Sequence, residues 1–110
     1  MSEKSIKSIT KTITSFALNK NVVISKIVLF GSEALDKANE ESDIDLMLIS
    51  KNFNKKSYSE RLRTLLGLNR SLIKQTNRPF DLLYYSNEEW ENTASPLIAE
   101  AKANGKIIYS

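Results

Sequence analysis

The most informative segment of the sequence is Leu29-Phe30-Gly31-Ser32, followed by ten residues and then by Asp43-Ile44-Asp45-Leu46. One apolar run, Lys26–Phe30, ends at the glycine, and a second apolar run begins at the two aspartates. Short runs rich in β-branched and aromatic residues are typical of buried strands. We therefore predict strands over 26–30 and 43–49, joined by a short helix and a polar connection.

Outward from this stretch, helical and strand patterns alternate along the whole chain. Alternation of this kind is typical of an α/β or α+β fold, in which helices pack on a small mixed β-sheet. The further elements predicted by apolar spacing are helices over 3–20, over 58–74 and from Asn92 or Thr93 to 103, and strands over 80–85 and 106–109.

Composition narrows the chemistry available to the chain. Its 110 residues include no Cys and no His, which excludes a thiol nucleophile, an imidazole relay and zinc sites built on those ligands. This length matches one compact domain, so we predict a single domain over 1–110. No apolar run approaches the roughly 18 residues of a membrane span, and the first residues lack a signal-peptide block. We expect a soluble cytoplasmic protein with no membrane partner.

Charge is distributed in blocks, although the net charge is only +3. Residues 51–78 carry eight basic residues and one acid, whereas residues 31–50 carry six acids and one lysine. The basic block is either a solvated helix face or a nucleic-acid-binding surface. Nucleic acid is the less favoured partner, because the block has few aromatic residues for base stacking and adjoins an acidic region.

The two aspartates of the most informative segment are the first candidates for chemistry. Residues i and i+2 of a strand project to the same face, so Asp43 and Asp45 lie together at the start of an apolar strand. Their mutual repulsion near a core is costly, and a divalent cation between them removes that cost. Carboxylate oxygens suit Mg²⁺ or Mn²⁺. The alternative is a loop-capping Asp43 and an exposed edge residue at Asp45.

Two further features favour the metal interpretation. Gly31 and Ser32 directly follow a strand, and a turn with free backbone N–H groups and a hydroxyl suits nucleotide phosphates, although ordinary turns share the pattern. Asp81 lies within a third apolar strand, where a lone carboxylate is costly unless it is paired or binds metal. If that strand neighbours the strand of Asp43 and Asp45, three carboxylates converge. Otherwise Asp81 is an edge residue that faces water.

Together, the apolar strand, Gly31-Ser32, the ten-residue spacer, Asp43-Ile44-Asp45 and the later Asp81 resemble the signature of the nucleotidyltransferase superfamily. The short chain and its closing strand of Ile107-Ile108-Tyr109 resemble the minimal (MNT-type) nucleotidyltransferases. In prokaryotes these proteins are commonly encoded with a HEPN-domain partner as toxin–antitoxin pairs. The resemblance extends over nearly the whole chain and implies the nucleotidyltransferase fold.

The resemblance also implies an activity: metal-dependent transfer of a nucleoside monophosphate, AMP from ATP, to a hydroxyl, often a tyrosine of the HEPN toxin, which makes the protein an antitoxin. Gly31 and Ser32 would bind phosphates, while Asp43, Asp45 and Asp81 would bind Mg²⁺ or Mn²⁺ and carry catalysis. Asp81 would also help to deprotonate the acceptor. The alternative is a non-catalytic or weakly catalytic antitoxin that neutralises its partner by occlusion. A homo-oligomer is compatible with both.

One position departs from the family pattern. Family members often carry Arg beside the Gly-Ser, where it neutralises phosphate, whereas this chain carries Glu33. A carboxylate there is unfavourable unless it faces away, so Glu33 favours the weakly catalytic alternative. The candidates for the missing positive charge are Lys37 and two arginines of the predicted 58–74 helix, Arg61 and Arg63.

Overall fold

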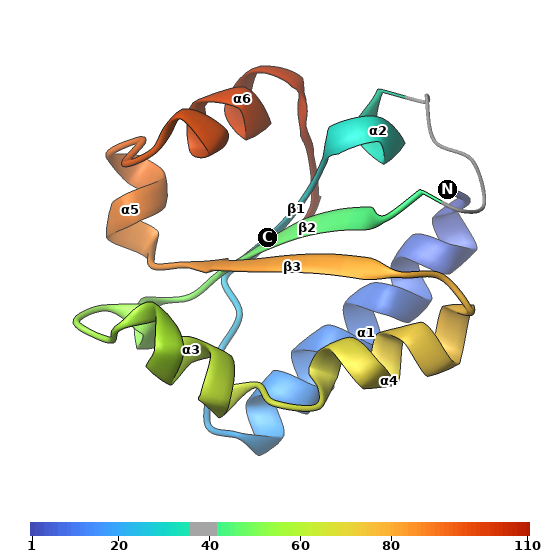
Figure 1. The fold of residues 1–110 in the computed structure, drawn as a ribbon, viewed down its shortest axis with the longest axis horizontal. Helices are drawn as coiled ribbons and strands as arrows, with labels where there is room; N and C mark the ends of the chain where they lie inside the picture. Colours follow the sequence, from blue (N-terminus) through green and yellow to red (C-terminus); the bar gives the residue numbers. More distant parts are fainter. Residues whose placement is uncertain (36–41) are drawn as a thin grey trace.

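A computed structural model describes residues 1–35 and 42–110 (Figure 1). Its centre is a four-stranded sheet with the strand order β3-β2-β1-β4. β1 pairs antiparallel with both β2 and β4, whereas β2 and β3 run parallel, so the predicted mixed sheet is confirmed. The strands are β1 (Lys26–Phe30), β2 (Ile44–Ile49), β3 (Phe80–Tyr85) and β4 (Lys106–Tyr109).

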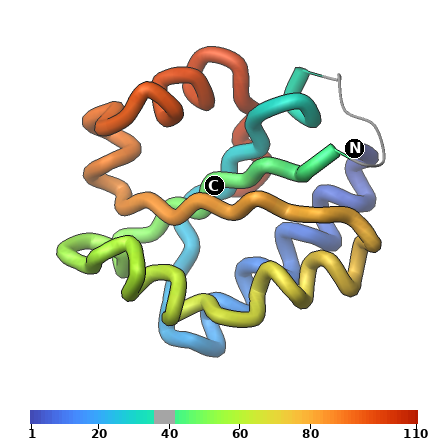
Figure 2. Tube along the Cα trace, in the orientation of Figure 1, coloured from blue at the N-terminus to red at the C-terminus, as the bar shows by residue number. Residues whose placement is uncertain are grey.

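Helices cover both faces of this sheet (Figures 1 and 2). α1 and α4 lie against one face, while α5 and α6 lie on the other side and α2 follows β1 directly. In the described part of the chain, no helix combines the length and the apolar character needed to cross a bilayer. The helices are α1 (Glu3–Asn19), α2 (Gly31–Ala34), the 3₁₀ turn η1 (Lys51–Phe53), α3 (Tyr58–Thr64), α4 (Leu68–Thr76), α5 (Asn87–Glu91) and α6 (Pro96–Asn104).

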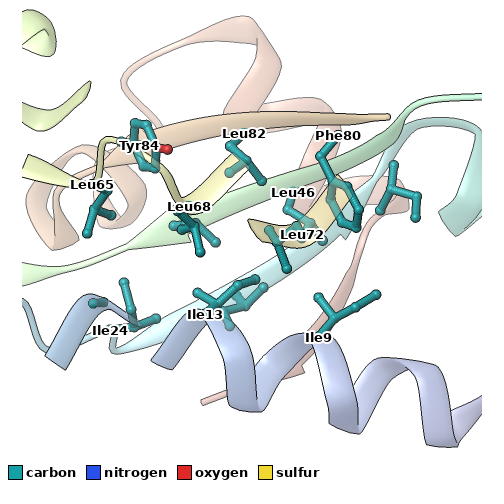
Figure 3. Packing of buried hydrophobic residues seen from close by; sticks show 14 of the residues in the cluster. Ile9, Ile13, Ile24, Leu46, Leu65, Leu68, Leu72, Phe80, Leu82 and Tyr84 are labelled. Atoms are coloured by element: carbon teal, nitrogen blue, oxygen red, sulfur yellow. The ribbon is translucent and has the colours of Figure 1, made fainter. Parts of the chain in front are cut away.

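The larger core lies between the sheet and the pair of helices α1 and α4 (Figure 3). Ile9, Ile13 and Ala17 form the buried stripe of α1, and Leu68 and Leu72 of α4 belong to the same cluster. Successive strand residues point to opposite faces, so Ile44, Leu46 and Leu48 of β2 enter this cluster, whereas Met47 and Ile49 enter a smaller cluster beside α6. Burial of each such side chain contributes about 1.5–3 kcal/mol, which fixes the sheet between its helices.

The single helix predicted between the second and third strands is wrong, because the chain forms two helices there, α3 and α4. Gly67 separates them with a φ of 97°, in the left-handed region that favours glycine and ends a continuous helix. The change of direction buries Leu65 and Leu68. It leaves Leu62 and Leu66, two residues of the predicted apolar stripe, exposed.

The last helix begins later than predicted. Asn92 or Thr93 was the expected cap, but the Ser95 side chain accepts a backbone N–H from the first turn of α6, and Pro96 occupies its first position. A separate short helix, α5, precedes it and is capped by Ser86 through a reciprocal capping box. Because α5 has only five residues and buries none of them fully, apolar spacing could not reveal it.

Candidate functional site

The strand register sets two of the predicted site residues side by side. Asp45 of β2 pairs with Asp81 of the parallel strand β3, and on its other side Asp45 pairs with Phe30 of β1. Paired residues on neighbouring strands lie about 4.8 Å apart and project to the same face. The condition for bringing Asp81 near the Asp-x-Asp segment, adjacency of the two strands, is therefore met, and both carboxylates project from one face of the sheet.

Gly31 brings the turn after β1 directly against Asp45. Its φ of 72° lies in the left-handed region, and a Cβ atom at this position would collide with Oδ2 of Asp45. The backbone conformation and the close approach both require glycine. Ser32 follows in the first turn of α2 and is partly exposed. The Gly-Ser turn and the Asp-x-Asp segment thus belong to one site.

Asp43 lies just before β2, which begins at Ile44 rather than at Asp43 as predicted. The N–H of Ile44 donates to the carbonyl of Pro79 at 2.9 Å, which anchors the start of β2 beside the start of β3. Asp43 is exposed, yet its charge acts on Asp45. It therefore stands at the open end of the same site.

The carboxylates of this site repel one another. Burial, followed by the negative charges of Asp81 and Asp43, raises the pKa of Asp45 from 3.8 to about 6. Among residues 1–35 and 42–110, no three acidic side chains are arranged to hold a metal ion by themselves. Mg²⁺ usually takes one or two carboxylates and completes its octahedron with water and phosphate oxygens. The repelling carboxylates fit a divalent cation that arrives together with a phosphate-bearing ligand.

Glu33, the departure from the family pattern, is buried and paired. Only 6% of the residue is exposed, and its carboxylate contacts the Arg78 guanidinium and lies 3.6 Å from the amino group of Met1. Two cationic groups therefore balance its charge. Glu33 does not present an uncompensated carboxylate to the Gly31-Ser32 turn.

Arg61, one of the candidates for the missing positive charge, lies away from the Gly31-Ser32 turn. Arg61 donates to the Glu89 carboxylate at 2.6 Å and to the Tyr84 carbonyl at 3.0 Å, at the opposite end of β3 from Asp81. A buried guanidinium needs such partners, and these hold it away from the site. Arg63 is exposed on α3.

Two other basic residues could supply positive charge beside the Gly31-Ser32 turn. Lys37 lies outside the described residues. Arg78, which sequence reasoning did not single out, is the arginine that reaches the α2 segment, through Glu33. Its only sequence signal was its position three residues before Asp81.

Comparison with solved structures places the fold. A Sulfolobus solfataricus protein provisionally assigned as a nucleotidyltransferase matches with a TM-score of 0.57 at 14% identity, over 97% of this chain and 86% of that one. A toxin–antitoxin structure with AMP-PNP matches with a TM-score of 0.60 at 19% identity, over 100% of this chain and 74% of that one. The TM-scores show a common fold, and at sequence identities this low the matches show the fold alone.

Comparison with families is more specific. No curated protein matches this sequence. The family described as "Polymerase beta, Nucleotidyltransferase" matches residues 11–110, a range that contains the Gly-Ser turn and the three aspartates. With that match over most of its length, the chain belongs to the polymerase beta nucleotidyltransferase family.

Proposed function

We propose that this chain is a metal-dependent nucleotidyltransferase that moves AMP from ATP to a hydroxyl group on a partner protein. The observation that carries the proposal is the register that pairs Asp45 with Asp81 while Gly31 lies against the Asp45 carboxylate. The turn, which suits phosphate, therefore lies beside the carboxylates, which suit a hard cation. Family membership supplies the reaction class.

The residues divide the work as follows. The backbone N–H groups and hydroxyl of the Gly31-Ser32 turn bind the phosphates. Asp43, Asp45 and Asp81 hold Mg²⁺ or Mn²⁺, which when bound neutralises phosphate charge. The exposed Asp81 also accepts the proton of the acceptor hydroxyl. The acceptor oxygen forms a bond to the α-phosphorus. The bond between the α-phosphorus and the oxygen that bridges it to the β-phosphate breaks, and pyrophosphate leaves.

The adenine nucleotide and the protein acceptor are inferred from two sources. A toxin–antitoxin structure with AMP-PNP shares the fold, and the sequence signature resembles the minimal nucleotidyltransferases. We infer a HEPN-type toxin as partner and its tyrosine hydroxyl as acceptor, which makes this chain an antitoxin. Asp43 and Asp81 are exposed, so a side chain presented by a partner can approach them.

A second candidate is an antitoxin that binds the same partner and neutralises it by occlusion, with little or no transfer. The observation that favours it is the Glu33–Arg78 pair. Where family members often carry Arg, this chain has an acid whose charge is balanced by a neighbouring arginine. The pair therefore adds no net positive charge beside the phosphate-binding turn.

The deciding experiment uses the chain, labelled ATP, Mg²⁺ and the protein encoded beside it. We expect label on a partner tyrosine, located by mass spectrometry, and no label when EDTA is present. Labelling should fall by about 10²-fold or more when Asp81→Asn replaces the wild type. The matched control is Glu91→Gln, an exposed acid of α5. Partner binding without any label, in the presence of Mg²⁺ and ATP, would instead support occlusion.

A further inference from the structure

Arg78 joins the three segments that carry the site. Its guanidinium pairs with the Glu33 carboxylate of α2, and its Nη2 donates to the Ser42 carbonyl at 3.0 Å, directly before Asp43. Its own backbone lies three residues before Asp81. One side chain therefore contacts α2, which begins with Gly31 and Ser32, and the residue that precedes the Asp-x-Asp segment.

The two side chains of this ion pair are largely buried. The Glu33 side chain is 7% exposed and the Arg78 side chain 20%, so water competes weakly for their charges. A planar guanidinium can bind a carboxylate and a carbonyl at once in fixed directions, which a lysine ammonium on a flexible stem cannot reproduce. Removing one member of such a pair leaves the other charge poorly compensated.

Backbone contacts complete the connection. The Pro79 carbonyl accepts the Ile44 N–H, and Phe80 pairs with Ile44 in the β2–β3 ladder. Arg78 is thereby fixed relative to β2, and its hold on Glu33 transmits that placement to α2. The separation of α2 and β2 leaves little tolerance, since Gly31 has no room for a Cβ atom against Asp45.

We propose that Arg78 is a positioning residue: through Glu33 and Ser42 it aligns the Gly31-Ser32 turn with the aspartates. The inference rests on the proposed nucleotidyl transfer. The groups that bind the nucleotide stay present without Arg78, but their alignment is lost. A misplacement of about 1 Å at a reacting centre costs on the order of 10²-fold in rate. Loss of Arg78 should therefore lower kcat for transfer far more than it raises KM for ATP.

The test compares Arg78→Met, Glu33→Gln, the double variant Glu33→Gln/Arg78→Met and Arg78→Lys. We expect kcat to fall by about 10²-fold in Arg78→Met and about 10-fold in Glu33→Gln, with KM for ATP within about threefold of wild type. Because the two residues act as a pair, the double variant should be no slower than Arg78→Met. Arg78→Lys should recover only part of the rate. Arg70→Met, an exposed arginine of α4, is the control and should match wild type.

Rates are measured below the thermal midpoint of each variant, with folding checked by circular dichroism. If Arg78→Met does not fold, the test uses the double variant and Arg78→Lys. The double variant has no carboxylate at position 33, and Arg78→Lys keeps a cation beside the Glu33 carboxylate. Wild-type kcat in both, or strictly additive losses, would overturn the role of Arg78. A wild type that binds Mg²⁺-ATP and partner but transfers nothing refutes the proposed function, and the role with it. An active wild type with equally active variants refutes only the role.

Discussion

The two ends of β3 differ in whether their partly buried charges are paired. At its C-terminal end, Arg61 donates to the Glu89 carboxylate and to the Tyr84 carbonyl, and the N–H of Ser86 donates to the same carboxylate at 2.8 Å. Although burial opposes ionisation, the hydrogen bonds from Ser86 and Arg61 lower the pKa of Glu89. Every charge named at this end has a partner within the fold.

At the N-terminal end of the same strand, the charges oppose one another. Burial and the charges of Asp81 and Asp43 raise the pKa of Asp45 to about 6, the opposite direction from Glu89. Fold-supporting ion pairs favour the ionised form, whereas a cluster that disfavours it is typical of a binding or catalytic site. We infer that the C-terminal end of β3 is anchored by its ion pair, whereas its N-terminal end is the candidate ligand site.

The largest effect should come from Asp45, the carboxylate at the centre of the repelling cluster. Asp45→Asn removes a metal-binding charge without changing the size of the side chain, so transfer should fall to the detection limit and binding of Mg²⁺-ATP should weaken strongly. Calorimetry and label transfer on one preparation measure both. Wild-type binding and transfer in this variant would show that the contrast between the two ends has no functional meaning.

Asp81 should show a more selective effect. If Asp81 serves the acceptor as well as the metal, as proposed, Asp81→Asn should lower transfer by about 10²–10⁴-fold, the range for a lost general base. Binding of Mg²⁺-ATP should change little, since Asp43, Asp45 and the Gly31-Ser32 turn remain. Titration calorimetry beside transfer rates checks the separation. Transfer at the wild-type rate would make Asp81 an ordinary strand residue.

At the C-terminal end of β3, a substitution should lower the free energy of unfolding rather than the rate of transfer. Arg61→Met leaves the Glu89 carboxylate without its cation, and we expect a loss of about 2–3 kcal/mol, below the 3–5 kcal/mol of a fully buried pair because Glu89 is partly exposed. Urea unfolding measures the loss, with the exposed Arg63→Met as control. Transfer by the folded fraction should stay near wild type. A large fall in kcat without a stability change would place Arg61 in the site after all.

These contrasts also explain what the sequence could predict. Residues of the site are specified locally: a glycine after a strand and two acids at i and i+2 follow from strand geometry alone. Whether the strand of Asp81 neighbours the strand of Asp45 depended on strand order, which the sequence left open, and the β2–β3 ladder places the two residues opposite each other. The bend at Gly67 was missed because the apolar residues on either side of it keep an almost helical spacing in the sequence. The left-handed conformation of the glycine is visible only in the structure.

The ion pairs could not be predicted from the sequence. Glu33 with Arg78 and Arg61 with Glu89 each join residues far apart in the chain. Which base meets which acid depends on how α2 packs against β1 and β2 and on how α3 packs against β3. Charge counting suggested Arg61 for the phosphate site, whereas packing placed it at the other end.

The smallest expected effect is also the most direct measure of the repulsion at Asp45. Its pKa is higher in the folded chain, about 6, than its ordinary 3.8, so between these values the folded state holds a proton that the unfolded state has released. In metal-free buffer, the contribution of Asp45 to stability therefore falls as pH rises from about 4 to about 6. Asp45→Asn removes this dependence. After allowance for solvent screening, the variant should be roughly 1 kcal/mol more stable than wild type at pH 7 and equal to it near pH 4. Urea unfolding at both pH values tests this, and a variant less stable at pH 7 would mean that Asp45 supports the fold as Glu89 does.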